Sequence, residues 1–301
     1  MQEYSKQAIT IEEQIEKLQK RGLKLSDKAF AAEALSNISY YRLRAYTYPY
    51  QDNTDPNHPF IKDISFEEII KLYKFDSKLR LLIFEATEKI EVSLRTQITY
   101  HMSINHGSHW YLDVKHFRNK RNFHLHQELI RKEISRSKEV FIKHYKKKYA
   151  SPELPPAWMT LEVLSMGLLS KLFQNLYNKA EKKAILKHFG IKNVDVLENW
   201  IYCFVSLRNI CAHHSRIWNR RLPKISKPRV IQGTFLNNLD VMPNKLYLTL
   251  SAMIYTLNRV CPDHTLLDDL IALIDEYKHH LDIVADMGFP DNWREEALWQ
   301  K

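Results

Sequence analysis

The sequence predicts an all-α protein, a bundle of long antiparallel helices. Apolar residues recur at three- and four-residue spacing along most of the 301 residues, as they do on the buried faces of helices. Two capping boxes, Thr10 with Glu13 and Ser65 with Glu68, mark helix starts. The chain has only six glycines, which argues against glycine-rich phosphate loops and against a fold made of many tight turns.

The first 60 residues predict a small N-terminal helical segment. The first capping box starts a helix that ends at Gly22, and residues 26–38 give a second short helix. Residues 39–51 are rich in tyrosine and alternate only weakly, so we expect an extended segment or an irregular aromatic plug. Residues 52–59 have the composition of a loop. We therefore divide the chain into this segment, 1–60, and a helical domain, 61–301.

The longest helix of the larger region begins at the second capping box and covers residues 65–103. Residues 103–122 resemble a polar loop, and residues 123–149 predict one helix. The expected apolar side of that helix includes Leu125, Leu129, Ile134, Val140 and Phe141. The proline-containing stretch 151–156 is the clearest break in the chain.

The second half of the chain continues in helices. We expect helical structure over residues 157–177, a short helix that ends at Gly190, and a helix over residues 193–215. A basic linker with two prolines, 222–233, precedes two further helices at 244–260 and 265–286. The sequence shows no internal repeat and no low-complexity tract.

The charge of the chain favours a polyanionic partner. The net charge is +10, and residues 115–148 hold twelve Lys and Arg against three Glu. Residues 115–126 also place Phe117 and Phe123 among cations, a pattern that suits phosphate contacts and base stacking on single-stranded RNA. A solvated surface would give the same pattern. With the acid-free stretch 216–229, the candidates for RNA binding are Arg118, Lys120, Arg121, Arg216, Arg220 and Arg221.

Residues 206–223, SLRNICAHHSRIWNRRLP, gather cations and imidazoles at the end of an apolar helix. Arg208 follows an apolar stripe, where a guanidinium is unfavourable unless it meets an anion. Asn209 and His213 are one turn apart, so the amide can orient the imidazole. At about 100° per residue, Arg208 and His213 point roughly 140° apart. One helix therefore makes an incomplete site, and two copies across a symmetry axis would converge better.

These side chains suit RNA cleavage. A 2′-hydroxyl needs a base to attack phosphorus and the leaving 5′-oxygen needs an acid, and imidazole serves both purposes near neutral pH. An arginine can stabilise the charge of the phosphorane, and the scheme requires no metal. Because arginine followed by histidine at this spacing recurs elsewhere, for example at Arg121 and His126, the prediction depends on the surrounding string.

The string RNICAHH resembles the R-N-x-x-x-H motif of the HEPN superfamily, helical ribonucleases of prokaryotic defence and toxin–antitoxin systems. The longer RNICAHHSRIWNR resembles the Abi-like, or abortive-infection, branch. Four further blocks are similar to that family in the same order: ISYYRLRAYTYPYQ, FDSKLRLLIFEATEKIEVSLRTQI, SKEVFIKHYKKKY and LPPAWMTLEVLSMGLLSKLFQNL.

The resemblance implies a HEPN-type bundle that forms a homodimer, with two motifs in one cleft. It implies a metal-independent endoribonuclease without cofactors that acts in abortive infection and leaves a 2′,3′-cyclic phosphate. Arg208 and His213 would be the catalytic pair, with Asn209 and His214 in support. Some Abi-like proteins are similar to toxins held in check by a small structured RNA, so a second RNA partner is also expected.

Three charged residues among apolar neighbours are further candidates. Glu91 and Arg95 have the spacing of a pair within one helix turn, which is either an ordinary ion pair or a polar cluster that faces the motif. Glu162 either lies on an exposed face or pairs with an inward arginine such as Arg208. We expect Trp158 and Trp218 to be packing residues.

Other classes of protein lack support. Three cysteines without C-x-x-C spacing and a start without an apolar stretch predict reduced thiols in a cytoplasmic protein. No stretch is apolar enough to span a membrane, and the His and Cys residues have no metal-ligand spacing. The alternative function is a non-catalytic RNA-binding or protein-interaction module on the same helices. Binding to an anionic membrane surface is a third possibility.

Overall fold

The computed structural model describes residues 3, 5, 7–228, 233–278 and 282–300. Every regular element in these ranges is a helix, and the only strand-like pairings are three isolated bridges. The predicted all-α class is confirmed.

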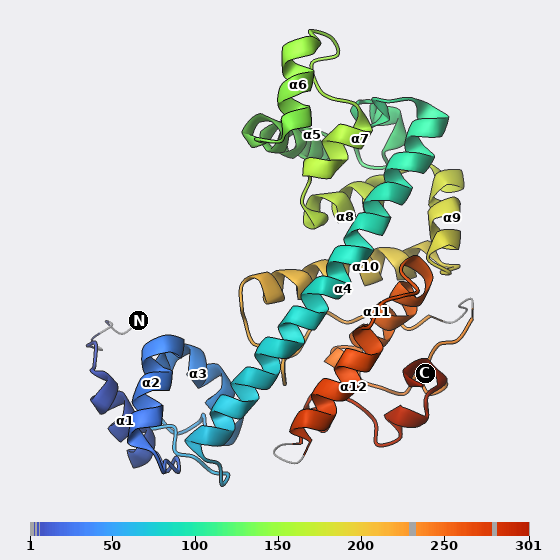
Figure 1. Cartoon of the computed structure of the whole chain (residues 1–301). Helices are drawn as coiled ribbons and strands as arrows, with labels where there is room; N and C mark the ends of the chain where they lie inside the picture. The colour runs from blue at the N-terminus through green and yellow to red at the C-terminus, as the bar shows by residue number, and fades with distance from the viewer. Residues whose placement is uncertain (1–2, 4, 6, 229–232, 279–281, 301) are drawn as a thin grey trace.

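Helix α4 (Phe66–His106) is the spine of the molecule (Figure 1). Its 41 residues span about 60 Å at the usual rise of an α-helix. The predicted capping box is present, with the Ser65 hydroxyl on the amide of Glu68 and the Glu68 carboxylate on the amide of Ser65. The helix ends at Gly107, whose φ of +84° is left-handed and suits glycine.

The N-terminal helices α1 (Ile11–Lys20), α2 (Lys28–Ile38) and α3 (Tyr40–Thr47) lie at the start of α4 (Figure 1). The Thr10 capping box of α1 is present as predicted. The expectation of an extended or irregular segment at 39–51 was wrong, because residues 40–50 form α3 and the 3₁₀ turn η1 (Tyr48–Tyr50). The helix buries Leu43, Tyr46 and Thr47 on one face, and tertiary packing outweighs the weak local pattern.

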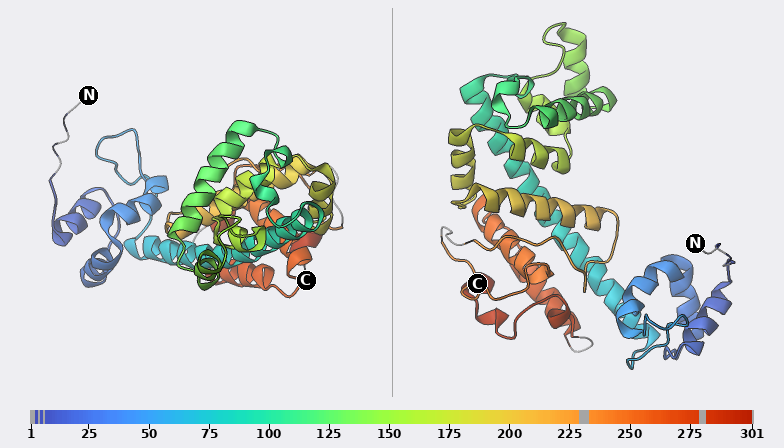
Figure 2. Two further views of the ribbon diagram at one scale, coloured as in Figure 1. Left: turned by 90° about the horizontal axis from the view of Figure 1, so that it is seen from above. Right: turned by 180° about the vertical axis from the view of Figure 1, so that it is seen from behind.

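The opposite end of α4 carries η2 (Trp110–Leu112), η3 (Val114–His116), α5 (Lys120–Arg136) and α6 (Val140–Lys148). The predicted polar loop at 103–122 was wrong. Helix α4 continues to His106, and Trp110, Tyr111 and Phe117 are buried in the turns that follow. Figure 2 shows this end of the molecule well separated from the N-terminal helices.

Residues 123–149 form two helices and not the single predicted one, with a break at Ser137. The predicted apolar side was also partly wrong, because three of its members are exposed: Leu125, Leu129 and Val140. The face of α5 that packs on α8 instead presents Phe123, His126, Ile130 and Ile134. The leucines indicated a face through Leu125 and Leu129, whereas the buried face passes through His126 and Ile130, one residue further along the chain. The sequence pattern missed this face because one of its buried members is a histidine.

The middle of the chain folds into α7 (Ala157–Thr160), η4 (Leu161–Val163), α8 (Met166–Asn175), α9 (Lys179–His188) and α10 (Val194–Ala212). The predicted helical stretch 157–177 is interrupted at Leu164, and Ser165 caps α8. Helix α10 ends at Ala212, three residues earlier than predicted. It crosses the middle of α4, and Figures 1 and 2 show the crossing from both sides.

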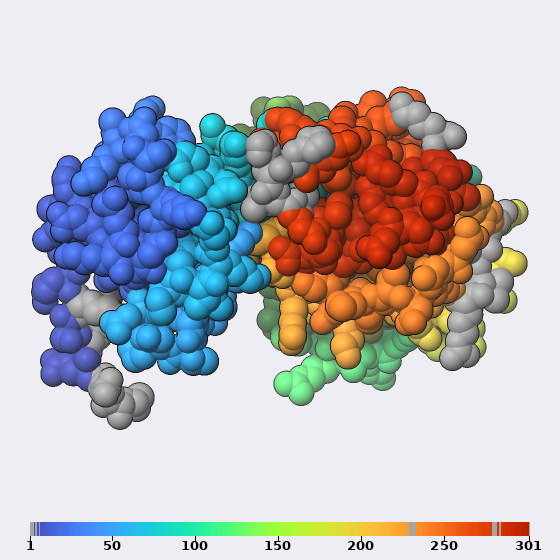
Figure 3. All heavy atoms as spheres, turned by 90° about the horizontal axis from the view of Figure 1, so that it is seen from below, coloured from blue at the N-terminus to red at the C-terminus, as the bar shows by residue number. Residues whose placement is uncertain are grey.

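Helices α11 (Leu246–Val260) and α12 (Leu266–Tyr277) pack along α4, and α11 also contacts α10. The short helix α13 (Ile283–Asp286) and the turns η5 (Trp293–Glu295) and η6 (Ala297–Trp299) follow. The predicted helix 265–286 is thus divided, and its residues 279–281, like 229–232 of the predicted linker, lie outside the described ranges. From below, Figure 3 shows the N-terminal helices and the C-terminal helices on opposite sides of the molecule.

None of the helices in the described part of the chain combines the length and the apolar character that crossing a bilayer requires.

Candidate functional site

The motif lies at the C-terminal end of α10, where this helix crosses α4. The guanidinium of Arg208 stands 5.4 Å from the ring centroid of Phe84 on α4, and both side chains are partly exposed. Among the described residues, Arg208 has no hydrogen bond and no ion pair. A cation over an aromatic face is held in place while its N–H donors remain available. The predicted position of Arg208 beside a core stripe is confirmed, and no acidic side chain in the part of the chain that the structure describes forms an ion pair with it.

The two histidines form the end of the helix. His213 is the C-terminal capping residue and is exposed, and His214 follows with a left-handed φ of +54°. The amide of His214 donates to Cys211 O at 2.9 Å, and the amide of Ser215 donates to Ile210 O at 3.0 Å. These two bonds define a Schellman motif, in which the left-handed position is usually glycine. A histidine occupies it here at some conformational cost.

Asn209 is exposed on the same side of α10 as His213. The amide of His213 donates to the main-chain oxygen of Asn209 at 3.0 Å, but no bond joins the two side chains among the described contacts. The side chain of Arg208 lies against Phe84 of α4, whereas His213 is exposed at the C-terminal end of α10. The two predicted catalytic side chains therefore belong to one surface region but do not contact each other.

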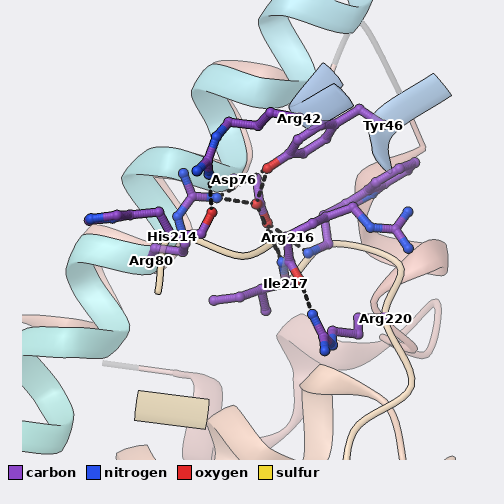
Figure 4. A network of polar contacts seen from close by, with 9 residues as sticks. Arg42, Tyr46, Asp76, Arg80, His214, Arg216, Ile217 and Arg220 are labelled. Atoms are coloured by element: carbon purple, nitrogen blue, oxygen red, sulfur yellow. Dashed lines mark hydrogen bonds and ion pairs between the residues drawn. The ribbon is translucent and has the colours of Figure 1, made fainter. Parts of the chain in front are cut away.

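A buried carboxylate anchors the chain immediately after the histidines (Figure 4). Asp76 of α4 accepts the amides of Ile217 at 3.1 Å and of Trp218 at 2.7 Å, and the phenol of Tyr46 at 2.6 Å. Arg80, one turn further along α4, forms an ion pair with Asp76 and donates to the Tyr46 oxygen at 3.1 Å. One side chain thus joins α3, α4 and the segment that leaves the motif.

Burial and hydrogen-bond donors have opposite effects on the pKa of Asp76. Burial raises the pKa of the carboxyl group, whereas the phenol of Tyr46, the amides and Arg80 oppose that rise. Both oxygens of Asp76 accept hydrogen bonds from N–H or O–H donors. None of these donors is a group that could accept a hydrogen bond from a protonated carboxyl group in the same geometry. Burial also raises the pKa of Tyr46, which keeps the phenol a donor. We therefore treat this buried group as a carboxylate.

The arginines of the predicted basic tail differ in their surroundings. Arg216 is largely buried, with its guanidinium 5.8 Å from the ring centroid of Trp218, and burial lowers its pKa. Its Nη1 atom is buried without a hydrogen-bond partner. Arg220 and Arg221 are exposed, and Arg220 donates to the main-chain oxygen of Arg216 at 3.2 Å. Trp218 is fully buried, as predicted, whereas Trp158 is half exposed, against the expectation of packing.

The region around the motif is therefore strongly cationic. In the described structure, the segment 208–221 contains four arginines, Arg208, Arg216, Arg220 and Arg221, and Arg42 binds its main chain. Asp76 is the acid at their centre, and Arg80 already neutralises it. The remaining charge favours a polyanion at this face.

The candidate acids lie elsewhere on α4. Arg95 forms the predicted pair with Glu91 at 2.7 Å and donates to Leu164 O at 3.0 Å. Glu162, 53% exposed, pairs with Arg95 at 3.7 Å, and not with Arg208. Arg95 is eleven residues from Phe84, about 16 Å along α4. This cluster ties η4 to α4, and the structure does not bring it to the motif.

The other predicted RNA-binding residues lie near the far end of α10. Lys120 and Arg121 are exposed at the start of α5, and Arg118 approaches Glu198 at 3.7 Å. Glu198 precedes Arg208 by ten residues, about 15 Å along the helix. Phe117 and Phe123 are buried against each other with ring centroids 5.0 Å apart. The expectation that these two aromatic rings could stack on bases was wrong.

The cysteines of the motif helix do not provide a nucleophile. Burial raises the pKa of both Cys203 and Cys211 to about 12, so their thiols stay protonated at neutral pH. All three cysteines are free. In the described ranges, no group of three or more His, Cys, Asp or Glu side chains is arranged to hold a metal ion.

Sequence reasoning missed the residues that hold the motif in place: Arg42, Tyr46, Asp76 and Arg80. One signal was present, because Asp76 and Arg80 are spaced as a pair and Asp76 follows the buried Phe75. The long-range contacts of Asp76 with Ile217 and Trp218 leave no local pattern.

Fold and site together define an all-helical protein with an unneutralised arginine and two terminal histidines on one basic face. A sequence profile of the Abi-like protein family matches residues 33–219, well over half of the chain, and the chain belongs to this family. The matched range begins in α2 and ends at Asn219, directly after Trp218. No curated protein matches the chain, and no solved structure does.

Proposed function

We propose that this chain is a metal-independent endoribonuclease of the HEPN type that acts in abortive infection. The family membership supports the biological setting. The chemistry rests on one observation: the guanidinium of Arg208 is held on the ring of Phe84, close to the surface, without a carboxylate partner among the described residues. A fixed and unneutralised guanidinium beside exposed imidazoles is suited to a phosphodiester.

In the proposed reaction, His213 removes the proton from a ribose 2′-hydroxyl or gives a proton to the leaving 5′-oxygen. The 2′-oxygen bonds to phosphorus, the bond to the 5′-oxygen breaks, and a 2′,3′-cyclic phosphate and a 5′-hydroxyl result. Arg208 stabilises the charge that gathers on the phosphorane. Asn209 and His214 flank His213, and Asn209 is placed to contact the substrate from its exposed position.

A base and an acid are both required, and a second copy of the chain would supply the second imidazole. The surface beside Arg208 is suited to such a contact. Leu81 and Phe84, one turn apart on α4, are 70% and 41% exposed. Exposed apolar side chains next to a functional arginine are typical of a protein interface. The proposed active form is thus a homodimer in the cytoplasm, with its two motifs facing each other.

The remaining basic residues extend the proposed path of the RNA. Arg220 and Arg221 continue from the motif, while Arg118, Lys120 and Arg121 form a second basic region near α5. The second region could hold a longer substrate or a small structured inhibitory RNA. Phosphate contacts of this kind weaken with salt, so binding there should be strongly salt-dependent.

The test is cleavage of a labelled single-stranded RNA of mixed sequence in the presence of EDTA. Arg208→Ala and His213→Ala should each lower the rate by at least about 100-fold, because each removes a group that acts on the transition state. Neither side chain is buried, so melting temperatures should stay close to wild type.

His101→Ala and Arg294→Ala are the matched controls. His101 lies seventeen residues beyond Phe84 on α4, about 25 Å away, and Arg294 pairs with Asp275 near the C-terminus. Both variants should cut like the wild type. An RNA-binding module without catalysis would bind the same RNA and cut nothing, and a His213→Ala variant with full activity would exclude the proposed role of His213.

A further inference from the structure

Three side chains of the N-terminal region are connected to the motif segment, two of them directly and one through Asp76, and Figure 4 shows Arg42 and Tyr46 among them. Arg42 of α3 donates from Nη1 to the main-chain oxygen of His214 at 2.6 Å. Tyr46, one turn on, donates to Asp76, which holds the amides of Ile217 and Trp218. The ring of Tyr50 in η1 stacks on Trp218, with centroids 6.3 Å apart and planes 9° from parallel. We call Arg42, Tyr46 and Tyr50 the N-terminal clamp.

The backbone that the clamp holds is unfavourable without such support. His214 and Asn219 both have left-handed φ values, +54° and +47°, and neither is glycine. Side chains with a Cβ adopt this conformation at an energetic cost, and they persist there when the surroundings fix it. Arg42 binds the carbonyl of the first of these residues. Asp76 binds the two amides that precede the second.

The first left-handed residue directly follows His213. Because the carbonyl of His214 is held from α3 and its amide from Cys211, both sides of this residue are fixed. A rotation about the backbone at His214 would move the end of α10 and with it the exposed imidazole of His213. Arg42 is itself exposed, so its bond adds little buried area and mainly constrains geometry.

We propose that the N-terminal clamp positions His213 for catalysis, with Arg42 as the principal positioning residue. This proposal rests on the proposed ribonuclease function. The clamp makes residues 39–50 part of the working site, although they lie more than 150 residues from the motif in sequence. Displacement of a catalytic group by about 1 Å can lower a rate by about 100-fold, so a constraint on one carbonyl is sufficient.

The decisive variants are Arg42→Ala, Arg42→Lys and Arg44→Ala. Arg44 is on the same helix but contacts His58 at 2.9 Å, so it is the matched control. Arg42→Ala should lower kcat for RNA cleavage about 10- to 100-fold with KM within about 3-fold, because substrate contacts remain. Arg42→Lys keeps one donor and should recover part of kcat. Arg44→Ala should leave both constants unchanged.

Amide hydrogen exchange of residues 213–218 gives an independent measurement that needs no catalytic activity. Arg42→Ala should increase exchange in this segment, and Arg44→Ala should not. Wild-type kcat in Arg42→Ala, or equal losses in Arg42→Ala and Arg44→Ala, would overturn the positioning role. If the wild type cuts no RNA, the ribonuclease proposal fails, while unchanged exchange in Arg42→Ala would separately refute the clamp.

Discussion

Substitution of Asp76 by asparagine should destabilise the protein severely. The carboxylate is fully buried and pairs with Arg80, whose side chain is 6% exposed. Asparagine has nearly the same shape as aspartate but no charge. Its NH₂ group, which can only donate hydrogen bonds, would face groups that are themselves donors. Breaking a buried ion pair from one side costs about 3–5 kcal/mol, because the other charge stays buried without a partner. A loss of this size would remove a large part of the usual stability of a domain, about 5–15 kcal/mol.

The same helix offers an internal control. Glu85 and Lys89 also form a pair at the i,i+4 spacing, but their side chains are 57% and 35% exposed. Glu85→Gln should therefore have little effect on the free energy of unfolding. The double variant Asp76→Asn with Arg80→Met removes the orphaned charge as well. It should be more stable than Asp76→Asn alone, because apolar replacement of a buried pair is often well tolerated.

Urea unfolding followed by circular dichroism and tryptophan fluorescence measures these free energies. The fluorescence signal includes Trp218, whose amide is bound to Asp76. A cost below about 1 kcal/mol for Asp76→Asn would refute the reasoning, since the carboxylate would then not be the anchor of the segment after the motif.

Four further substitutions, two of them in one ion pair, test other features of the structure. His214→Gly should raise stability by about 0.5–1 kcal/mol in urea unfolding, because glycine accepts the left-handed φ without strain. Burial lowers the pKa of His116 below its ordinary 6.5, so the unfolded chain takes up a proton that the folded chain refuses, and stability falls as the pH drops below 6.5. His116→Asn should make the fall of Tm between pH 7 and 5 shallower. Glu198→Gln should cost about 2–4 kcal/mol in urea unfolding because it leaves Lys182, 4% exposed, without its partner at 2.7 Å, whereas Lys182→Met should be far milder.

For each of these substitutions, a specific result would contradict the expectation. A less stable His214→Gly variant would mean that the histidine side chain, and not the backbone alone, stabilises the helix end. An unchanged pH slope in His116→Asn would assign the acid sensitivity to other buried histidines, such as His126, whose pKa burial also lowers. Equal losses of unfolding free energy in Glu198→Gln and Lys182→Met would indicate that these two side chains stabilise the fold by packing and not by their charges.

Local chemistry made part of the fold predictable. The two capping boxes located the starts of α1 and α4, because a hydroxyl and a carboxylate satisfy the free amides of a helix end whatever surrounds them. The apolar stripe likewise located α10. By contrast, α3 and the face of α5 depend on what packs against them. Tyr46 is buried because Asp76 accepts its phenol, and His126 takes a core position that a leucine pattern does not reveal.

The candidate site was predictable to a similar extent. Arg208 and His213 stood out because cations and imidazoles followed an apolar helix, and the structure places both near the surface at that helix end. The support for the site was not predictable. The bond from Arg42 to His214 joins residues 172 positions apart, and Asp76 binds amides more than 140 positions away. Main-chain amides have no residue identity, so no sequence pattern specifies them as partners.

The most direct test of the ribonuclease proposal is the chemistry of the RNA ends. Wild-type protein, incubated with single-stranded RNA in EDTA, should produce fragments with 2′,3′-cyclic phosphates and 5′-hydroxyls, which mass spectrometry distinguishes from other termini. The same products should be missing with His213→Ala. Intact RNA with the wild type, or fragments with 5′-phosphates and 3′-hydroxyls that His213→Ala also yields, would contradict the proposal.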